Sequence, residues 1–279
     1  MTADTALSPC TGMLSRGRSC PARSLESPVL AVRTPSLITA FALAAAAPAA
    51  FAAHPLQTED TGTQGAGNLE IENGVSNARL DATTRTVYQP QFSLGLAATL
   101  DAILQPAWVW QHAPRGGVSG PGDTNVDAKW RFWGSDPLSL AIRAGIELAT
   151  AERGLGLPRG KAAGHALLAL TWDHAATTLH ADLGATVAPR VAGAPARRTT
   201  VNVSGALMQQ VDEGLILTLD GAFGQSPDPR RDGWPGTLLA GAIWTARPGL
   251  DLDFGWQRSI DDRPVTRTWL AGLTYRFAL

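Results

Sequence analysis

Period-two alternation of apolar and polar residues is the feature that most limits what this chain can fold into. In the segment TNVDAKWRF (124–132) the two kinds of residue alternate without a break. Successive side chains of a β-strand point to opposite faces, so this alternation indicates strands with one apolar and one polar face. About twelve such segments of roughly ten residues each are predicted. They are 68–75, 88–100, 102–112, 124–132, 138–148, 165–174, 177–187, 200–210, 214–223, 236–245, 250–258 and 268–279.

The connections between these segments alternate in length. Short ones, such as 99–101, are followed by long ones rich in Pro and Gly, which are predicted loops at 113–123, 152–164, 188–198, 225–235 and 259–267. Tight turns on one rim and extended loops on the other are typical of an up-and-down barrel. We therefore predict an all-β fold, a closed antiparallel up-and-down transmembrane β-barrel of about 12 strands. Closure requires the last strand to pair with the first, near 67–79.

Alternation alone does not decide whether the apolar face points inward or outward. A lipocalin-like soluble barrel has its apolar face inside, whereas a membrane barrel turns it toward lipid. About eight strands already leave an interior that side chains just fill, so twelve would leave a gap that apolar residues cannot close. The polar parity also carries charges of both signs, which hydrocarbon does not tolerate. These charged residues are predicted to line the lumen: Glu70, Glu72, Asp127, Lys129, Arg131, Arg143, Glu147, Asp182, Asp220, Asp251, Asp253 and Arg276.

Large aromatic residues gather near strand ends on the apolar parity, as in the interfacial girdle of a membrane barrel. The predicted girdle is Trp130, Phe132, Trp256, Trp269, Tyr275 and Phe277. The last strand resembles the C-terminal signal that the barrel-assembly machinery recognises, although Ala278 and Leu279 follow the aromatic residue with which that signal usually ends. We expect this machinery and the lipids of the Gram-negative outer membrane as partners.

The N-terminal 53 residues have the features of a secretory signal with an extended basic region. Arginines precede a short apolar stretch, and Ala50-Phe51-Ala52 fits the small-x-small pattern of a signal peptidase site. We expect cleavage after Ala52, or after Ala53 by a shift of one. Both cysteines of the chain lie in this part, so the mature protein has none to form disulfides. Residues 54–66 form a segment that is either a periplasmic tail or a lumenal element restricting passage, and 67–279 form the barrel.

A family resemblance begins at HPLQTEDTGTQGAGNLEIENG (54–74). This stretch resembles the start of mature proteins in the family of outer-membrane proteins of the meta-pathway of phenol degradation. In that family a His-Pro-Leu, an acidic step, Asp-Thr-Gly-Thr-Gln-Gly and a strand with Glu residues follow the signal. Segments 92–110 and 121–133 look like the next hairpins of the same family. The resemblance covers most of the chain after residue 53 and implies an outer-membrane barrel, but it transfers no functional residues.

These features predict a channel or transporter for small-molecule solutes, with hydrophobic or aromatic compounds among the candidates. The fixed charges of both signs would set selectivity by field and hydrogen bonding. An alternative is a closed structural or adhesion barrel that acts through its long loops, because a charge-balanced lumen fits plugging as well as conduction. The formal net charge of −1 provides no basic footprint for nucleic acid.

An outer-membrane hydrolase is a third and weaker candidate. Such enzymes need a Ser or Thr beside a His and an orienting polar group, but no spacing motif joins Ser139 or Ser204 to His165, His174 or His180. His54 would be an N-terminal copper ligand after cleavage at Ala53, yet Pro55 follows and no second anchored His is near. We therefore expect no enzymatic activity, no metal and no cofactor.

Overall fold

The described residues form a closed β-barrel. The structure is a computed structural model, and it describes residues 54–114, 116–152, 155, 161–189, 196–260 and 265–279. The predicted signal, 1–53, therefore lies outside the described residues. Within the described part, no helix has the length and hydropathy needed to cross a membrane.

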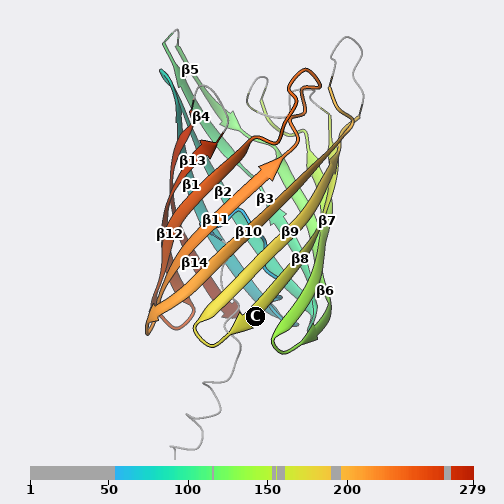
Figure 1. Cartoon of the computed structure of the whole chain (residues 1–279), viewed down its shortest axis with the longest axis vertical. Coiled ribbons are helices and arrows are strands. Elements are labelled where there is room, and N and C mark those ends of the chain that lie inside the picture. The colour runs from blue at the N-terminus through green and yellow to red at the C-terminus, as the bar shows by residue number, and fades with distance from the viewer. Residues whose placement is uncertain (1–53, 115, 153–154, 156–160, 190–195, 261–264) are drawn as a thin grey trace, which may run out of the picture. The chain divides into compact units, whose positions relative to one another are not determined.

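Fourteen strand segments make up the wall, which is shown in Figure 1. Their bounds are β1 Asn68–Leu80, β2 Thr83–Ala97, β3 Leu100–Gln105, β4 Trp108–Ala113, β5 Gly116–Pro121, β6 Thr124–Ser135, β7 Leu138–Leu148, β8 Ala163–His174, β9 Thr177–Val187, β10 Thr199–Asp212, β11 Leu215–Gly224, β12 Gly236–Arg247, β13 Leu250–Ile260 and β14 Arg267–Ala278.

Two pairs of segments act as single interrupted strands, so the barrel has twelve strands, as predicted. β3 and β4 both pair with β2 and are separated by Pro106 and Ala107. β6 pairs with β3 and β5 pairs with β4, and β5 and β6 are separated by Gly122 and Asp123. Proline cannot donate to a strand ladder, which explains the break at Pro106. The Gly122 amide donates to the Ala107 carbonyl (2.8 Å), so the wall stays joined across the break.

The first strand closes the barrel against the last. β1 pairs antiparallel with both β14 and β2, and its register with β14 runs from Asn68 opposite Ala278 to Arg79 opposite Arg267. All strand pairings are antiparallel between neighbours, and every described strand except β5 pairs with a strand on each side. The predicted closure of the last strand on the first is therefore confirmed.

The two rims differ in their connections. Two-residue turns at 98–99, 136–137, 175–176, 213–214 and 248–249 share one rim with the C-terminus, at the bottom of Figure 1. We call it the short-turn rim. The opposite, long-loop rim carries the longer connections and one two-residue turn, 81–82, between β1 and β2. Gly214 and Gly249 have positive φ (81° and 78°), which these tight turns require and which glycine adopts without strain.

One predicted loop is wrong. Residues 113–123 were expected to be irregular because they are rich in Gly and Pro, but Gly116–Pro121 form β5, which pairs with β4 as a hairpin at the long-loop rim. Pairing of one whole edge with β4 satisfies the backbone groups on that side of the segment despite its low strand propensity. Pro121 stands at the last position of the strand, where an interrupted ladder needs no amide donor.

The two faces of the wall differ in polarity. Large apolar side chains such as Trp130 and Leu219 are more than half exposed on the outer face. Carboxylates and lysine on the alternate positions are buried inside, and Asp101 is completely inaccessible. Apolar groups outside and charges inside are the opposite of a soluble barrel and the arrangement expected for a barrel in lipid.

The predicted girdle aromatics fall into two groups on the outer face. Trp130 and Phe132 contact each other (5.8 Å between ring centroids) near the short-turn rim, as do Tyr275 and Phe277 (5.4 Å). Trp256 and Trp269 lie together (6.5 Å) farther toward the long-loop rim. Phe277 is half-buried, whereas the other five are exposed.

Candidate functional site

Residues 54–66, which we call the lumenal segment, lie inside the barrel. The segment has no regular secondary structure, and its contacts pass around the inner wall in chain order. It contacts β13 and β1 at His54, β11 at Gln57 and Thr58, β9 at Glu59, and β3 at Gln64. It then joins β1 at the short-turn rim.

Inward carboxylates hold the backbone of this segment. The amides of Gln57 and Thr58 donate to Asp220 Oδ2 (2.8 and 2.9 Å), and the amide of Glu59 donates to Asp182 Oδ2 (2.7 Å). An irregular segment in a dry interior needs acceptors for its N–H groups, and a carboxylate is the strongest acceptor that a side chain provides. Asp182 and Asp220 are thus occupied in binding the chain itself.

Two further contacts attach the segment near the short-turn rim. The amide of Gln64 donates to both oxygens of Asp101 (3.1 Å each). The hydroxyl groups of Thr61 and Ser139 are 2.5 Å apart, and the Thr61 amide donates to Thr171 Oγ1 (3.1 Å). Thr61 and Gln64 are therefore hydrogen-bonded to different strands of the wall, Thr61 to β7 and β8 and Gln64 to β3.

Glu59 is the centre of a buried ionic cluster, which we call the Glu59 cluster. Its two carboxylate oxygens accept from Lys129 Nζ (2.8 Å) and Arg143 Nη1 (2.6 Å). Lys129 also contacts Asp60 Oδ1 (3.2 Å), and Arg143 Nη2 contacts Asp127 Oδ2 (2.6 Å). Two cations from adjacent strands, β6 and β7, thus bind the lumenal segment by its own carboxylates.

The electrostatic environment keeps Glu59 ionised. Burial raises the pKa of its carboxyl group, but the charges and hydrogen bonds of Lys129 and Arg143 outweigh burial and lower the pKa from 4.5 to about 2. The interaction is therefore a true ion pair at neutral pH. Removal of either cation would leave a buried carboxylate with half of its partners.

A second group of charges, which we call the Arg276 cluster, lies on β1, β13 and β14. Arg276 donates from Nε to Glu70 Oε2 (2.6 Å) and from Nη1 to Asp251 Oδ2 (2.7 Å). Glu72 and Asp253 stand next to them on the same inward face and are buried. Arg276 therefore pairs with two of the four carboxylates in this group.

The remaining predicted lumen residues stand apart from both clusters. Glu147 lies on the inward parity of β7 toward the long-loop rim and is half-buried. Arg131 lines a cavity of about 450 Å³ at the short-turn rim, together with Ser139 and Asp173. Neither residue contacts the lumenal segment through a hydrogen bond in the described structure.

The sequence pattern did not identify the lumen residues that lie in the irregular segment 54–66. Glu59, Asp60 and His54 were not assigned to the lumen lining because 54–66 shows no period. Asp101 was placed in a turn between 88–100 and 102–112, yet it is the first inward residue of β3. Its parity with the inward Ile103 was the one signal that would have identified it.

Among the described contacts, neither His165 nor His180 has the partners of a catalytic histidine. His165 Nε2 contacts Asp127 Oδ1 (2.8 Å) with no hydroxyl group at its other ring nitrogen among the described contacts. His180 Nδ1 contacts Thr171 Oγ1 (2.9 Å), but its Nε2 faces the sulfur of Met208 (3.2 Å) rather than a carboxylate. The group that would orient this imidazole for base catalysis is therefore not in place.

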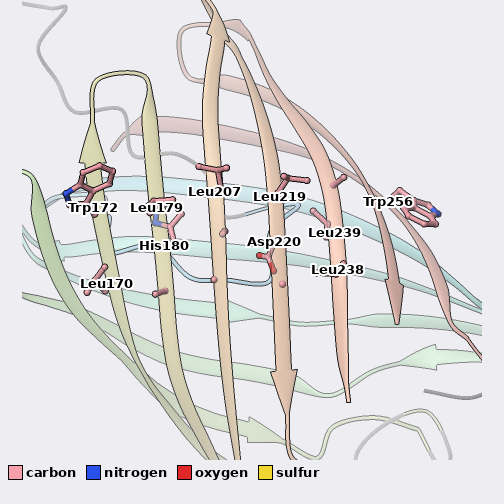
Figure 2. Close-up of a pocket in the computed structure, with 15 residues that line it drawn as sticks. Leu170, Trp172, Leu179, His180, Leu207, Leu219, Asp220, Leu238, Leu239 and Trp256 are labelled. Carbon is pink, nitrogen blue, oxygen red and sulfur yellow. The ribbon is translucent and has the colours of Figure 1, made fainter. Parts of the chain in front are cut away.

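A separate cavity of about 730 Å³ lies across β8 to β13 (Figure 2). Leucines and two tryptophans, Trp172 and Trp256, surround it on the outer face, and the small residues Gly205 and Gly221 are paired at its floor. Figure 2 shows the tryptophans at opposite sides of the cavity. This depression is apolar on the outer face, and the inward residues His180 and Asp220 are also among those that line it.

No family model matches the sequence, and no curated protein matches it significantly. Solved structures do match its fold. An outer membrane channel from Pseudomonas putida F1 has 12% identity and a TM-score of 0.63, covering 80% of this chain and 100% of that chain. The NanC porin has 8% identity and a TM-score of 0.56, over 74% of this chain and 98% of its own. The KdgM porin has 8% identity and a TM-score of 0.51, over 74% and 99%.

At these identities the likeness establishes the fold. The chain has the closed antiparallel barrel fold of bacterial outer-membrane channels, and its apolar exterior is the surface by which such barrels contact lipid.

Proposed function

We propose that this protein is an outer-membrane channel for small molecules, in which the lumenal segment narrows the path. The observation that carries the proposal is the ionic interior that surrounds residues 54–66 within an apolar outer wall. A charged lumen holds water and ordered side chains, whereas an apolar exterior is stable only in lipid. Passage then follows the space between the segment and the wall.

Selectivity in this proposal comes from fixed charges and hydrogen bonds along the path. Lys129 and Arg143 are neutralised by Glu59, Asp60 and Asp127. Arg131 and Glu147 form no such pairs in the described structure and are half-buried near opposite ends of the lumen, so they act on a passing ion most directly. The clusters act indirectly, by holding the segment in position.

Hydrophobic or aromatic solutes are the substrate class that we favour. Support comes from the resemblance of 54–74 to the family of outer-membrane proteins of the meta-pathway of phenol degradation, to which we propose the chain belongs. We expect no catalysis, since the proposed path involves field and hydrogen bonding only. Partners other than solute, lipid and the assembly machinery are not required.

One observation favours the alternative of a closed structural barrel acting through its loops. Hydrogen bonds attach the lumenal segment to the wall from β1 around to β13, which is a plug-like arrangement. Liposome swelling with graded sugars and aromatic solutes separates the two functions. A channel gives swelling that falls with solute size, whereas a closed barrel gives the rate of empty liposomes for every solute.

A further inference from the structure

The surroundings of His54 carry a charge imbalance. Four inward carboxylates of the Arg276 cluster face one arginine, which contacts Glu70 and Asp251. Among the residues that the structure describes, no Lys or Arg side chain forms an ion pair with Glu72 or Asp253, and Oδ2 of Asp253 has no hydrogen-bond partner. Buried carboxylates without a cation are strongly unfavourable.

His54 is the group that approaches these two carboxylates. Its backbone nitrogen lies 3.4 Å from Glu72 Oε2, and its ring Nδ1 lies 2.5 Å from Asp253 Oδ1. The other oxygen of Glu72 accepts a hydrogen bond from Gln91 Nε2 (2.6 Å). Glu72 and Asp253, the two carboxylates without a cation, thus both contact His54, the first residue of the lumenal segment.

The wall is shaped to receive this residue. Gly74 and Gly272 are paired across β1 and β14, and a Cβ at Gly74 would come within 2.8 Å of the His54 ring, while one at Gly272 would overlap it. Gly241 and Gly255 form a second pair, across β12 and β13, and a Cβ there would come within 3.0 and 3.1 Å of Pro55. Four glycines therefore provide the space for residues 54 and 55.

We infer that this site binds the free amino terminus of the mature chain, whose α-ammonium group is the missing counter-charge of Glu72. Signal peptidase cleavage after Ala52 or Ala53 would create that group at Ala53 or His54, one residue apart. Cleavage after Ala53 places the positive charge on the His54 nitrogen, beside Glu72, while the His54 imidazole contacts Asp253. Signal removal would then be the step that completes the charge balance and seats the lumenal segment.

In the uncleaved precursor the His54 nitrogen belongs to a peptide amide, which is uncharged and is a weaker hydrogen-bond donor than an ammonium group. A free terminus brings a full positive charge to the position that the glycine pairs and carboxylates surround.

Amine labelling tests the inference on the mature protein purified from outer membranes. Intact mass first identifies the terminus. Reductive methylation of folded and denatured protein then measures α-amine reactivity, with the exposed Lys161 as an internal control for reagent. We expect a terminus at Ala53 or His54 whose amine reacts at least about tenfold more slowly than Lys161 when folded. After denaturation it should react at least as fast as Lys161, because an α-amine has the lower intrinsic pKa. We expect Glu72→Gln to raise its reactivity severalfold and Glu147→Gln to leave it unchanged.

A terminus elsewhere, a folded-state reactivity equal to that of Lys161, or unchanged protection in Glu72→Gln would overturn the inference. If Glu72→Gln does not assemble, Asp253→Asn replaces it, with the same expected increase. None of these results depends on conductance, so the inference and the proposed channel function succeed or fail separately.

Discussion

The carboxylate of Glu59 accepts a hydrogen bond from Nη1 of Arg143 at 2.6 Å, although the two residues are 84 positions apart and only one belongs to the barrel wall. Through this pair a strand residue fixes the position of an irregular segment in the lumen. Lys129 completes the arrangement from the adjacent strand. The lumenal segment is therefore part of the folded barrel, and changes to its partners should alter passage as well as stability.

Replacing two lumen arginines should change ion selectivity. Arg131 lines the cavity at the short-turn rim and Arg143 binds Glu59, so Arg131→Ala with Arg143→Ala removes two positive charges and should shift the channel toward cations. Reversal potentials in planar bilayers under a salt gradient measure the shift. Glu147→Gln, which removes a negative charge from the same wall, should shift selectivity the opposite way. Unchanged conductance and selectivity would count against a conducting role.

Acid should release the lumenal segment. The folded pKa of Glu59 is depressed from 4.5 to about 2, so its ion pairs contribute stability that is present above pH 4.5 and is lost as the pH falls toward 2. We expect conductance per channel to rise within this window. Glu59→Gln should lack that component, because its side chain does not titrate. A pH profile identical in the two proteins would refute the assignment to Glu59.

A disulfide should lock the segment against the wall. The hydroxyl oxygens of Thr61 and Ser139 are 2.5 Å apart, and residues 54–279 contain no cysteine, so Thr61→Cys with Ser139→Cys offers one possible bridge. If passage requires the segment to move, conductance should be lower when the pair is oxidised and should return on reduction. Ser139→Cys alone should respond to neither treatment. Equal conductance in both states means that solute passes a stationary segment.

A methyl group at Gly95 should displace the end of the segment. A Cβ at this position would overlap the backbone of Gly65, whereas one at Gly134 would lie 3.7 Å from Ser139, an ordinary contact. Gly95→Ala should destabilise the barrel by about 1–3 kcal/mol through overpacking, and Gly134→Ala should be nearly neutral. Unfolding of both variants in denaturant measures the difference. Similar effects of the two changes would contradict the close approach.

The loss of folding stability caused by an arginine on the outer face should depend on its depth in the bilayer. Leu219 is exposed in the middle of β11, and Leu148 is exposed at the end of β7 at the long-loop rim. Leu219→Arg should destabilise the folded barrel in lipid by about 2–4 kcal/mol, and Leu148→Arg by about 1 kcal/mol or less. Reversible unfolding in phospholipid vesicles compares them. Equal costs would mean that the outer face of β11 is not in hydrocarbon.

The strands and their faces could be predicted because both depend on local pattern. A period of two specifies which residues share a face, so Glu70, Asp127 and Arg276 were assigned to one side without knowledge of their partners. The error at 113–123 arose because Gly and Pro lower strand propensity, whereas pairing of Gly116–Pro121 with β4 depends on a neighbouring segment. Propensity does not include that neighbour.

The amino-acid sequence by itself determined that this chain forms a twelve-stranded wall with one apolar and one charged face, since alternation and turn spacing are properties of adjacent residues. Only the tertiary structure decided which charges meet. Arg276 reaches Glu70 across 206 positions because closure brings the last strand beside the first, and Glu59 reaches Arg143 because an aperiodic segment enters the lumen. Such partners are set by barrel closure and by the need of buried N–H groups and charges for partners, neither of which leaves a periodic signal.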